Sequence, residues 1–175
     1  GDNRCNNWPD FPISAYGATG GLIGNTVMIC GGDPYGGYGY VDECYSLTSE
    51  KATLAINMTV GRWLAVSIGS DNSLWVTGGF GNTGLLASTE YVTMSGTIPG
   101  PDLPMVLARH AIVAINSTCS MVIGGMGYDY YASTFFYDHI EGEWTNGPSL
   151  MEVRFDHAAG LVTDEVTDEH YVAVT

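Results

Sequence analysis

The sequence contains few basic residues. Lys and Arg together occur 5 times in 175 residues, against 19 Asp and Glu, and the net charge is −14. Binding to nucleic-acid phosphates requires Lys and Arg, so a nucleic-acid partner is disfavoured. An anionic membrane surface is disfavoured for the same reason. No apolar run approaches the ~20 residues that a membrane-spanning helix needs, and we expect no membrane insertion.

The sequence also lacks the usual motifs of metal and nucleotide sites. Its cysteines show no C-x-x-C spacing, and its histidines show neither His-x-His nor His-x-x-x-His, the kinds of spacing that favour zinc or nickel. No phosphate loop and no nucleophile elbow is present. We therefore predict no metal, no cofactor and no catalytic site in this chain, which we expect not to be an enzyme.

One acidic run is the remaining candidate for a cation. It consists of Asp164, Glu165, Asp168 and Glu169. Calcium prefers oxygen ligands, but the run lacks the glycine-punctuated spacing of an EF-hand loop. A solvated turn is the favoured interpretation, and a calcium site is the alternative.

Glycine is abundant and follows a repeat. Three short apolar runs end in a double glycine, at Gly31-Gly32, Gly78-Gly79 and Gly124-Gly125, spaced 47 and 46 residues apart. A fixed period of this length is typical of a solenoid, a propeller or an array. The accompanying Tyr, Thr, Val, Ile and Trp favour strands joined by tight turns. We predict an all-β fold and a single domain.

The period divides the chain into three whole repeats, 17–61, 62–108 and 109–153, with partial repeats at 1–16 and 154–175. In each whole repeat we expect four antiparallel strands, a to d, with a loop between b and c after the double glycine. They are predicted at 22–23, 27–30, 43–47 and 52–56; at 64–68, 74–77, 88–93 and 96–98; and at 110–115, 121–123, 135–138 and 143–145. Residues 80–86 are expected to be a loop.

The two partial repeats contain recognisable pieces of the same plan. The spacing of Trp8 and Pro12 recurs at Trp144 and Pro148, so we interpret Trp8 as the tail of an earlier repeat. At the other end, residues 154–158 are expected to open a fourth repeat. A turn at 162–169 and a second strand at 171–175 are expected to follow.

Several of these elements resemble the kelch repeat. They are Arg-x-x-His-Ala at 154–158, Gly124-Gly125, the aromatic-Tyr-Asp run at 136–138, and Trp144. The third repeat matches best, and the likeness covers essentially the whole chain. It implies a kelch-type β-propeller segment of four-stranded blades around a central channel, with Trp144 filling the space between blades. The first two repeats lack this Trp.

Arginine provides a further sign of the repeat. Arg62, Arg109 and Arg154 make up three of the five basic residues, and we interpret them as opening successive repeats. Propellers typically close with ~4–8 blades, so we expect the remaining blades elsewhere in a longer polypeptide. Because residues 171–175 match residues 73–77, we expect the chain to continue past Thr175 with Gly-Gly.

The histidines raise one catalytic alternative. His110 and His157 lie 47 residues apart in the same repeat position, and a structural role is the favoured interpretation. The alternative resembles galactose oxidase, a copper enzyme built on a kelch propeller, which needs a Tyr-His pair and a Tyr cross-linked to Cys. No Tyr-His dipeptide occurs here, so such a site would lie outside this segment.

The b–c loops provide the candidate binding residues. The kelch resemblance implies that these loops gather on one face with the d–a connectors. Exposed tyrosine suits contacts with a protein or a glycan; the alternative is that these rings pack on their own blades. The candidates are Tyr35, Tyr38, Tyr40, Tyr128, Tyr130 and Tyr131. We predict a non-catalytic binding or structural module, with an intracellular ligase adaptor as a further alternative.

Two features favour an extracellular location. Asn57 and Asn116 begin glycosylation sequons, and both are expected to be exposed. We expect a glycan on at least one of them, with Asn116 favoured. Cys30 ends a strand b and Cys44 lies in the strand c that should pair with it. Facing residues on paired strands have Cα atoms ~4.5–5.5 Å apart, within the range for a disulfide. We predict this disulfide, with small buried thiols as the alternative.

The third repeat provides the comparison for this pairing. There Ile123 and Phe136 are expected to hold the two positions that the cysteines occupy in the first repeat. The remaining cysteines, Cys5 and Cys119, lie two repeats apart, so we do not pair them with each other. A formed disulfide or glycan would exclude the intracellular adaptor.

Overall fold

The computed structural model describes residues 9–34, 36–37, 39–164 and 169–175. These residues form strands, turns and loops, with no helix among them, and hence none that is long and apolar enough to span a membrane. The predicted all-β class is confirmed. Outside the described residues lie Cys5, Trp8, Tyr35, Tyr38, Glu165 and Asp168.

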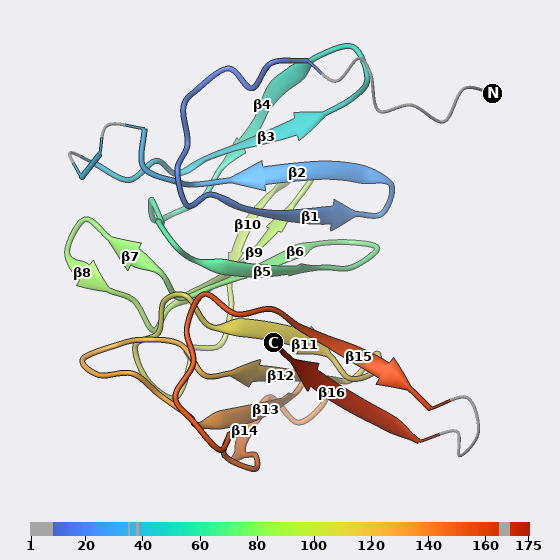
Figure 1. Ribbon diagram of the computed structural model, residues 1–175. Coiled ribbons are helices and arrows are strands. Elements are labelled where there is room, and N and C mark those ends of the chain that lie inside the picture. Colours follow the sequence, from blue (N-terminus) through green and yellow to red (C-terminus); the bar gives the residue numbers. More distant parts are fainter. Residues whose placement is uncertain (1–8, 35, 38, 165–168) are drawn as a thin grey trace.

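Three four-stranded antiparallel sheets follow one another along the chain, and a two-stranded hairpin comes last (Figure 1). Sheet 1 contains β1 (Thr19–Ile23), β2 (Thr26–Cys30), β3 (Glu43–Leu47) and β4 (Ala52–Asn57). Sheet 2 contains β5 (Val66–Gly69), β6 (Leu74–Thr77), β9 (Thr89–Thr93) and β10 (Gly96–Pro99). Sheet 3 contains β11 (Ala111–Ala114), β12 (Cys119–Ile123), β13 (Thr134–Asp138) and β14 (Glu143–Asn146). The last hairpin pairs β15 (Ala159–Thr163) with β16 (His170–Val174).

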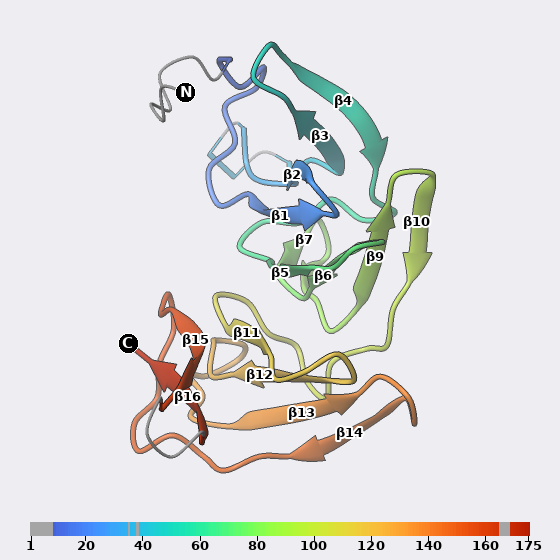
Figure 2. The ribbon, with the colours of Figure 1, turned by 90° about the vertical axis from the view of Figure 1, so that its right-hand side faces the viewer.

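The sheets stack with their first strands toward one side and their fourth strands toward the other, a propeller-like arrangement (Figure 2). Sheets 1 and 2 meet closely at β1 and β5. Ser70 follows β5, and its carbonyl accepts a hydrogen bond of 3.0 Å from the amide of Gly24. The Thr19 and Ser67 hydroxyls lie 2.7 Å apart. These contacts hold the two first strands side by side.

The cores lie between consecutive sheets. Sheets 1 and 2 enclose a cluster that includes Met28, Leu74 and Val76, all with no exposed surface. A second cluster, centred on Leu107 and Val122, lies between sheets 2 and 3. Because each inner sheet is covered on both faces, every residue of β6 is buried. This explains why the second strand of each repeat is a continuous apolar run and does not alternate with polar residues.

The double glycines join each sheet to the connector that precedes the next sheet. The amide of the second glycine donates to a carbonyl of that connector, in the pairs Gly32–Arg62 (2.8 Å), Gly79–Leu107 (2.8 Å) and Gly125–Arg154 (2.7 Å). A Cβ on the first glycine would lie close to the same carbonyl oxygen, at 2.5 Å for Gly31, 2.1 Å for Gly78 and 2.7 Å for Gly124. All six glycines have positive φ. The repeated pair thus provides both the backbone conformation and the space that each joint requires.

A second set of backbone bonds links the connectors themselves. The amides of Leu64, Arg109 and Asp156 donate to the carbonyls of Gly17, Leu64 and Arg109, at 2.9, 3.1 and 3.0 Å. The four residues have φ between 52° and 67°, so they hold the same position in successive repeats. The predicted equivalence of Arg109 with the other two arginines is therefore wrong, because Leu107 holds that position.

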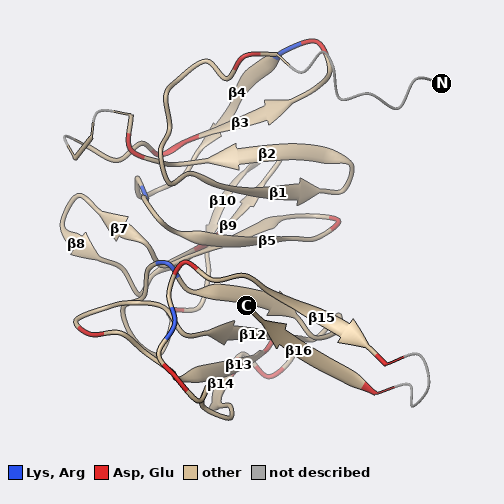
Figure 3. Cartoon of the chain, viewed as in Figure 1, with Lys and Arg blue, Asp and Glu red and all other residues tan. Residues whose placement is uncertain are grey.

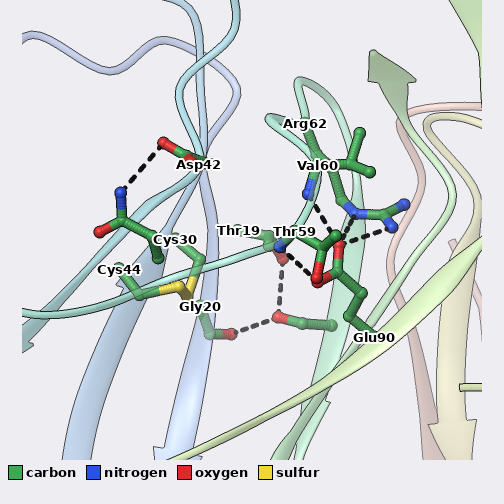
Figure 4. Close-up of a disulfide and its surroundings, with 11 residues drawn as sticks. Thr19, Gly20, Cys30, Asp42, Cys44, Thr59, Val60, Arg62 and Glu90 are labelled. Carbon is green, nitrogen blue, oxygen red and sulfur yellow. Dashed lines mark hydrogen bonds and ion pairs between the residues drawn. A yellow bond between two sulfur atoms is a disulfide. The ribbon is translucent and has the colours of Figure 1, made fainter. Parts of the chain in front are cut away.

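Arg62 is a buried charge at the first joint (Figure 4). Its guanidinium lies 2.9 Å from the Glu90 carboxylate, and the two side chains are 1% and 4% exposed. It also donates to the carbonyls of Ser88 and Gly78, at 2.7 and 3.0 Å. The amide of Thr59 donates to the same carboxylate at 2.6 Å. These bonds satisfy a charge pair that would otherwise be costly to bury.

The positive-φ positions also explain where the first strands begin. The predicted strand starts at Leu64 and His110 are too early. Leu64 and Arg109 are in the left-handed region, which interrupts an extended strand, so β5 starts at Val66 and β11 at Ala111. The expected loop 80–86 is also more ordered than predicted, because β7 (Phe80–Gly81) and β8 (Gly84–Leu85) form a short hairpin in it.

The predicted disulfide is present. Cys30 and Cys44 are directly opposite on β2 and β3, their Cα atoms are 4.0 Å apart, and their sulfurs are bonded (Figure 4). The comparison with the third repeat needs correction, because Ile123 faces Thr134 and not Phe136. Cys119 forms no disulfide within the described residues.

A threonine takes the place of Cys44 in the other two sheets. Thr89 faces Thr77, as Thr134 faces Ile123. The hydroxyls of Thr89 and Thr134 donate to the carbonyls of Pro101 and Pro148, at 2.9 and 2.8 Å, which fixes the start of each connector. In sheet 1 the disulfide occupies this position instead.

We expect loss of the disulfide to destabilise the protein. The two cysteines are 14 residues apart, and closing a loop of this size stabilises by about 3 kcal/mol in the chain-entropy model. The double variant Cys30→Ala/Cys44→Ala should lose roughly that free energy of unfolding in urea titrations. Cys119→Ala is the control and should change it by less than about 1 kcal/mol. Equal losses in the two proteins would show that the disulfide does not stabilise sheet 1.

Candidate functional site

The loops after β2, β6 and β12 gather on one side of the molecule, at the left in Figure 1, opposite the turn between β1 and β2. We call this side the loop face. The connectors that precede β5, β11 and β15 meet these loops through the double-glycine bonds. Each joint therefore places a loop beside the connector of the following repeat, and side chains from two repeats meet there.

The first group on the loop face is an aromatic cluster around Trp63. Tyr40 stacks on Trp63 with ring centroids 5.5 Å apart and an angle of 17°. Phe80 packs against Trp63 at 5.4 Å, and Tyr16 does so at 6.0 Å. Trp63 thus covers one ring face of Tyr40, whereas Tyr16 is 66% exposed.

A glycine-rich cleft of about 410 Å³ lies beside this cluster. Its lining includes Gly37, Gly39, Tyr40, Phe80 and Asn82. The Asn82 side-chain oxygen accepts a hydrogen bond of 3.2 Å from the Tyr40 amide, which connects the first loop to the β7–β8 hairpin. The cleft therefore combines aromatic edges with exposed backbone.

The second group is an exposed apolar surface, which we call the aromatic patch. Tyr130 and Phe155 stack with centroids 4.7 Å apart and an angle of 21°, yet they remain 48% and 41% exposed. Tyr128 is 90% exposed and Val153 54%. Stacking fixes two rings at the surface without covering them, which suits a preformed contact surface.

The four predicted tyrosines that the structure describes do not form one site. Tyr128 and Tyr130 belong to the aromatic patch, and Tyr40 belongs to the separate Trp63 cluster. Tyr131 packs against the core between sheets 2 and 3. This agrees with the alternative that the tyrosine rings pack on the sheets instead of facing a ligand. Phe155 was missed as a surface residue, because it lies inside the Arg-x-x-His-Ala motif and was interpreted only as part of that motif.

A partly exposed ion pair lies in the connectors. The Arg109 guanidinium lies 2.5 Å from the carboxylate of Asp156, joining two successive connectors. Elsewhere Asp and Glu are spread over turns and strand ends, and Lys and Arg are few (Figure 3). A basic surface suited to polyanions is not formed by the described residues.

The histidine geometry favours structural roles. The hydroxyl of Thr77 donates to the carbonyl of Val66 at 3.0 Å, so the contact of 2.8 Å between Thr77 Oγ1 and His110 Nε2 has the imidazole as donor. Burial, with His157 nearby, lowers the pKa of His110 to about 3, and the ring is neutral. The remaining two histidines contact other residues than His110 and His157 do. His139 contacts Ser120, and His170 contacts Thr163.

No metal-binding group emerges from the described residues. Within that part of the chain, no cluster of three His, Cys, Asp or Glu side chains is placed to hold an ion. Of the acidic run, Asp164 and Glu169 are described; the Asp164 amide donates to the Glu169 carbonyl at 2.8 Å and closes the base of the hairpin turn.

Both sequon asparagines are exposed, as predicted. Asn116 lies in the turn between β11 and β12, and its side-chain oxygen accepts bonds from the amide and hydroxyl of Thr118, at 2.8 and 3.0 Å. Asn57 is the last residue of β4, not part of the connector as predicted. Its side-chain amide donates to Asp42 at 3.4 Å.

Comparison with known proteins supports the fold. No family model and no curated protein matches the chain. The solved structure of YjhT is similar, with a TM-score of 0.77 at 13% identity. The match covers 88% of this chain, which spans 58% of the length of YjhT. At this identity the likeness shows the fold alone.

The buried His110 should make stability depend on pH. Its pKa is 6.5 when unfolded and about 3 when folded, so between these values the unfolded state binds more protons. Stability should therefore fall as pH drops from about 6.5 to about 3, by up to about 1.4 kcal/mol per pH unit from this group. In urea titrations across this range, His110→Gln should show a shallower dependence than wild type. His170→Gln, at an exposed position, should keep the wild-type slope; equal slopes in all three proteins would contradict the assignment.

Proposed function

We propose that the chain is a segment of an extracellular kelch-type β-propeller that binds a protein or a glycan through its loop face and has no catalytic site of its own. The aromatic patch is the observation that carries this proposal. Tyr130 and Phe155 expose stacked rings, and Tyr128, two residues before Tyr130 in the same loop, exposes a further ring. Aromatic rings at a surface combine apolar area with low entropy cost on binding.

The kelch assignment is supported by the repeated joint. The double glycine, the connector and the four-stranded order recur three times with a period close to 47 residues. The position of Trp144 between two sheets, with its ring 6.1 Å from that of Trp75, also supports this proposal. The similarity to YjhT supports the arrangement of the sheets.

The extracellular location is supported by the Cys30–Cys44 bond and the exposed sequons. Disulfides persist mainly in oxidising compartments, which argues against the intracellular adaptor. The second candidate is an extracellular enzyme resembling galactose oxidase. Among the described residues, the histidines of this chain take part in no group of side chains that could hold a copper ion. That candidate therefore requires an active site outside this segment.

Site-specific photo-cross-linking tests the loop face. A benzophenone amino acid at position 128 should capture a partner from the extracellular fluid in which the protein occurs. The same group at Ile140, which is 73% exposed at the turn after β13, should capture far less. Glycan arrays probed with the intact protein cover the case of a sugar ligand.

The captured ligand should then depend on the patch. Because the stacked rings provide the contact area, Tyr130→Ala/Phe155→Ala should weaken binding at least about tenfold, as measured by calorimetry. Ile140→Ala should leave the affinity unchanged. Equal capture at positions 128 and 140, or equal affinities for both variants, would reject the loop face as the binding surface.

A further inference from the structure

A cleft of about 560 Å³ lies between sheets 2 and 3, on the side opposite the loop face. Two turns form its rim, one between β5 and β6 and the other between β11 and β12. The turns contribute Ser70, Asp71, Ser73, Asn116 and Ser117. Its size is within the ~300–1,000 Å³ typical of ligand sites.

The inner wall of the cleft is aromatic. Tyr91 stacks on Trp75 with ring centroids 5.7 Å apart and an angle of 20°. Trp75 is only 3% exposed, so Tyr91 presents the stack to the cleft. His139 completes this wall, with its ring 5.3 Å from that of Trp75. An aromatic wall under a rim of hydroxyl, amide and carboxylate groups suits a sugar ring, which has apolar faces and polar edges.

Two polar groups of the cleft have bonding capacity to spare. Burial raises the pKa of Tyr91 to about 12, which keeps its hydroxyl protonated as a donor. Neither that hydroxyl nor the exposed Asp71 carboxylate has a hydrogen-bond partner in the part of the chain described here. Both can therefore bond to a ligand.

The rim carries its own attachment point for a sugar. Asn116 begins the sequon Asn116-Ser117-Thr118, and its side-chain oxygen is held by Thr118. Its side-chain nitrogen makes no bond within the described residues, unlike that of Asn57, which donates to Asp42. A sugar linked to this nitrogen starts at the edge of the cleft.

We propose that Asn116 is N-glycosylated and that the first N-acetylglucosamine of its glycan occupies the cleft against Tyr91. In the attachment step, Asn116 Nδ2 forms a bond to the sugar C1 of a lipid-pyrophosphate-linked oligosaccharide. The C1–O bond to the pyrophosphate breaks, the lipid pyrophosphate leaves, and Nδ2 loses one proton. The tether gives the sugar a high effective concentration at the cleft, so weak contacts suffice for occupancy.

Docking would join sheets 2 and 3 on the side where turns, not connectors, face each other. The sugar would contact one turn covalently and the opposite turn through Asp71 and Ser73. A glycan at Asn57 is the matched comparison. The Asn57 side-chain amide bonds to Asp42, and the asparagine does not line this cleft.

Proton NMR of the secreted chain carrying isotope-labelled N-acetylglucosamine tests the proposal directly. The protein is trimmed with an endoglycosidase so that one sugar remains on each occupied asparagine. Resonances of the Asn116-linked sugar should shift upfield from those of the same sugar on a proteolysed glycopeptide, because of the ring currents of Tyr91 and Trp75. The shift should disappear in Tyr91→Leu, while the Asn57-linked sugar keeps its resonances in both proteins.

Stability gives a second readout that does not depend on the Tyr91 variant folding well. In the Thr59→Ala background, which lacks the Asn57 sequon, protein made with N-glycosylation inhibited should melt at a lower temperature than protein that carries the single sugar on Asn116. Both samples have the same sequence and keep Thr118, whose hydroxyl bonds the Asn116 side chain, so the difference reports the sugar alone. An unmodified Asn116 in secreted protein, or glycopeptide-like resonances on the folded chain, would overturn the proposal. Both results leave binding at the loop face unaffected, so the two proposals fail separately.

Discussion

The structure depends on one repeated contact, in which a carbonyl of the connector to the next sheet lies against a double glycine. The amide of the second glycine bonds this carbonyl, and the missing side chain of the first glycine leaves room for it. Any Cβ there would meet backbone, which cannot move aside as a flexible side chain can. The joint therefore sets the distance between consecutive sheets, and the cores between sheets follow from it.

The same joint separates the two sides of the molecule chemically. On the loop face it places each b–c loop beside the next connector, which produces the Trp63 cluster and the aromatic patch. On the opposite side only short turns meet, and sheets 2 and 3 leave a cleft between them. The buried Arg62–Glu90 pair ties one connector to sheet 2, so charge is used inside a joint while most of the acidic residues remain at turns and strand ends.

Much of this fold could be predicted from the apolar runs and the glycines of the sequence. The second strands and the Cys30–Cys44 pairing were predictable, because a run covered on both faces stays apolar throughout. The position of Arg109 within its repeat could not be predicted. Leu64 and Asp156 hold the equivalent positions with positive φ, and neither residue type signals that conformation. The register of Thr134 was missed although Ser-Thr and Gly-Pro recur together at Ser88-Thr89, Gly100-Pro101, Ser133-Thr134 and Gly147-Pro148. The pairing of Tyr130 with Phe155 required the joint itself, because the two residues belong to different repeats.

Two alanine substitutions measure the joint most directly. Gly36 and Gly78 both have positive φ, at 69° and 58°, but a Cβ at Gly36 would meet nothing within 4 Å, whereas one at Gly78 would lie 2.1 Å from the Leu107 carbonyl. Gly36→Ala should cost about 1–2 kcal/mol of unfolding free energy, from φ alone. Gly78→Ala should cost several kcal/mol in the same urea titration, because the connector must also move. Equal losses in the two variants would contradict the claim that the double glycine is a close-packed joint between repeats.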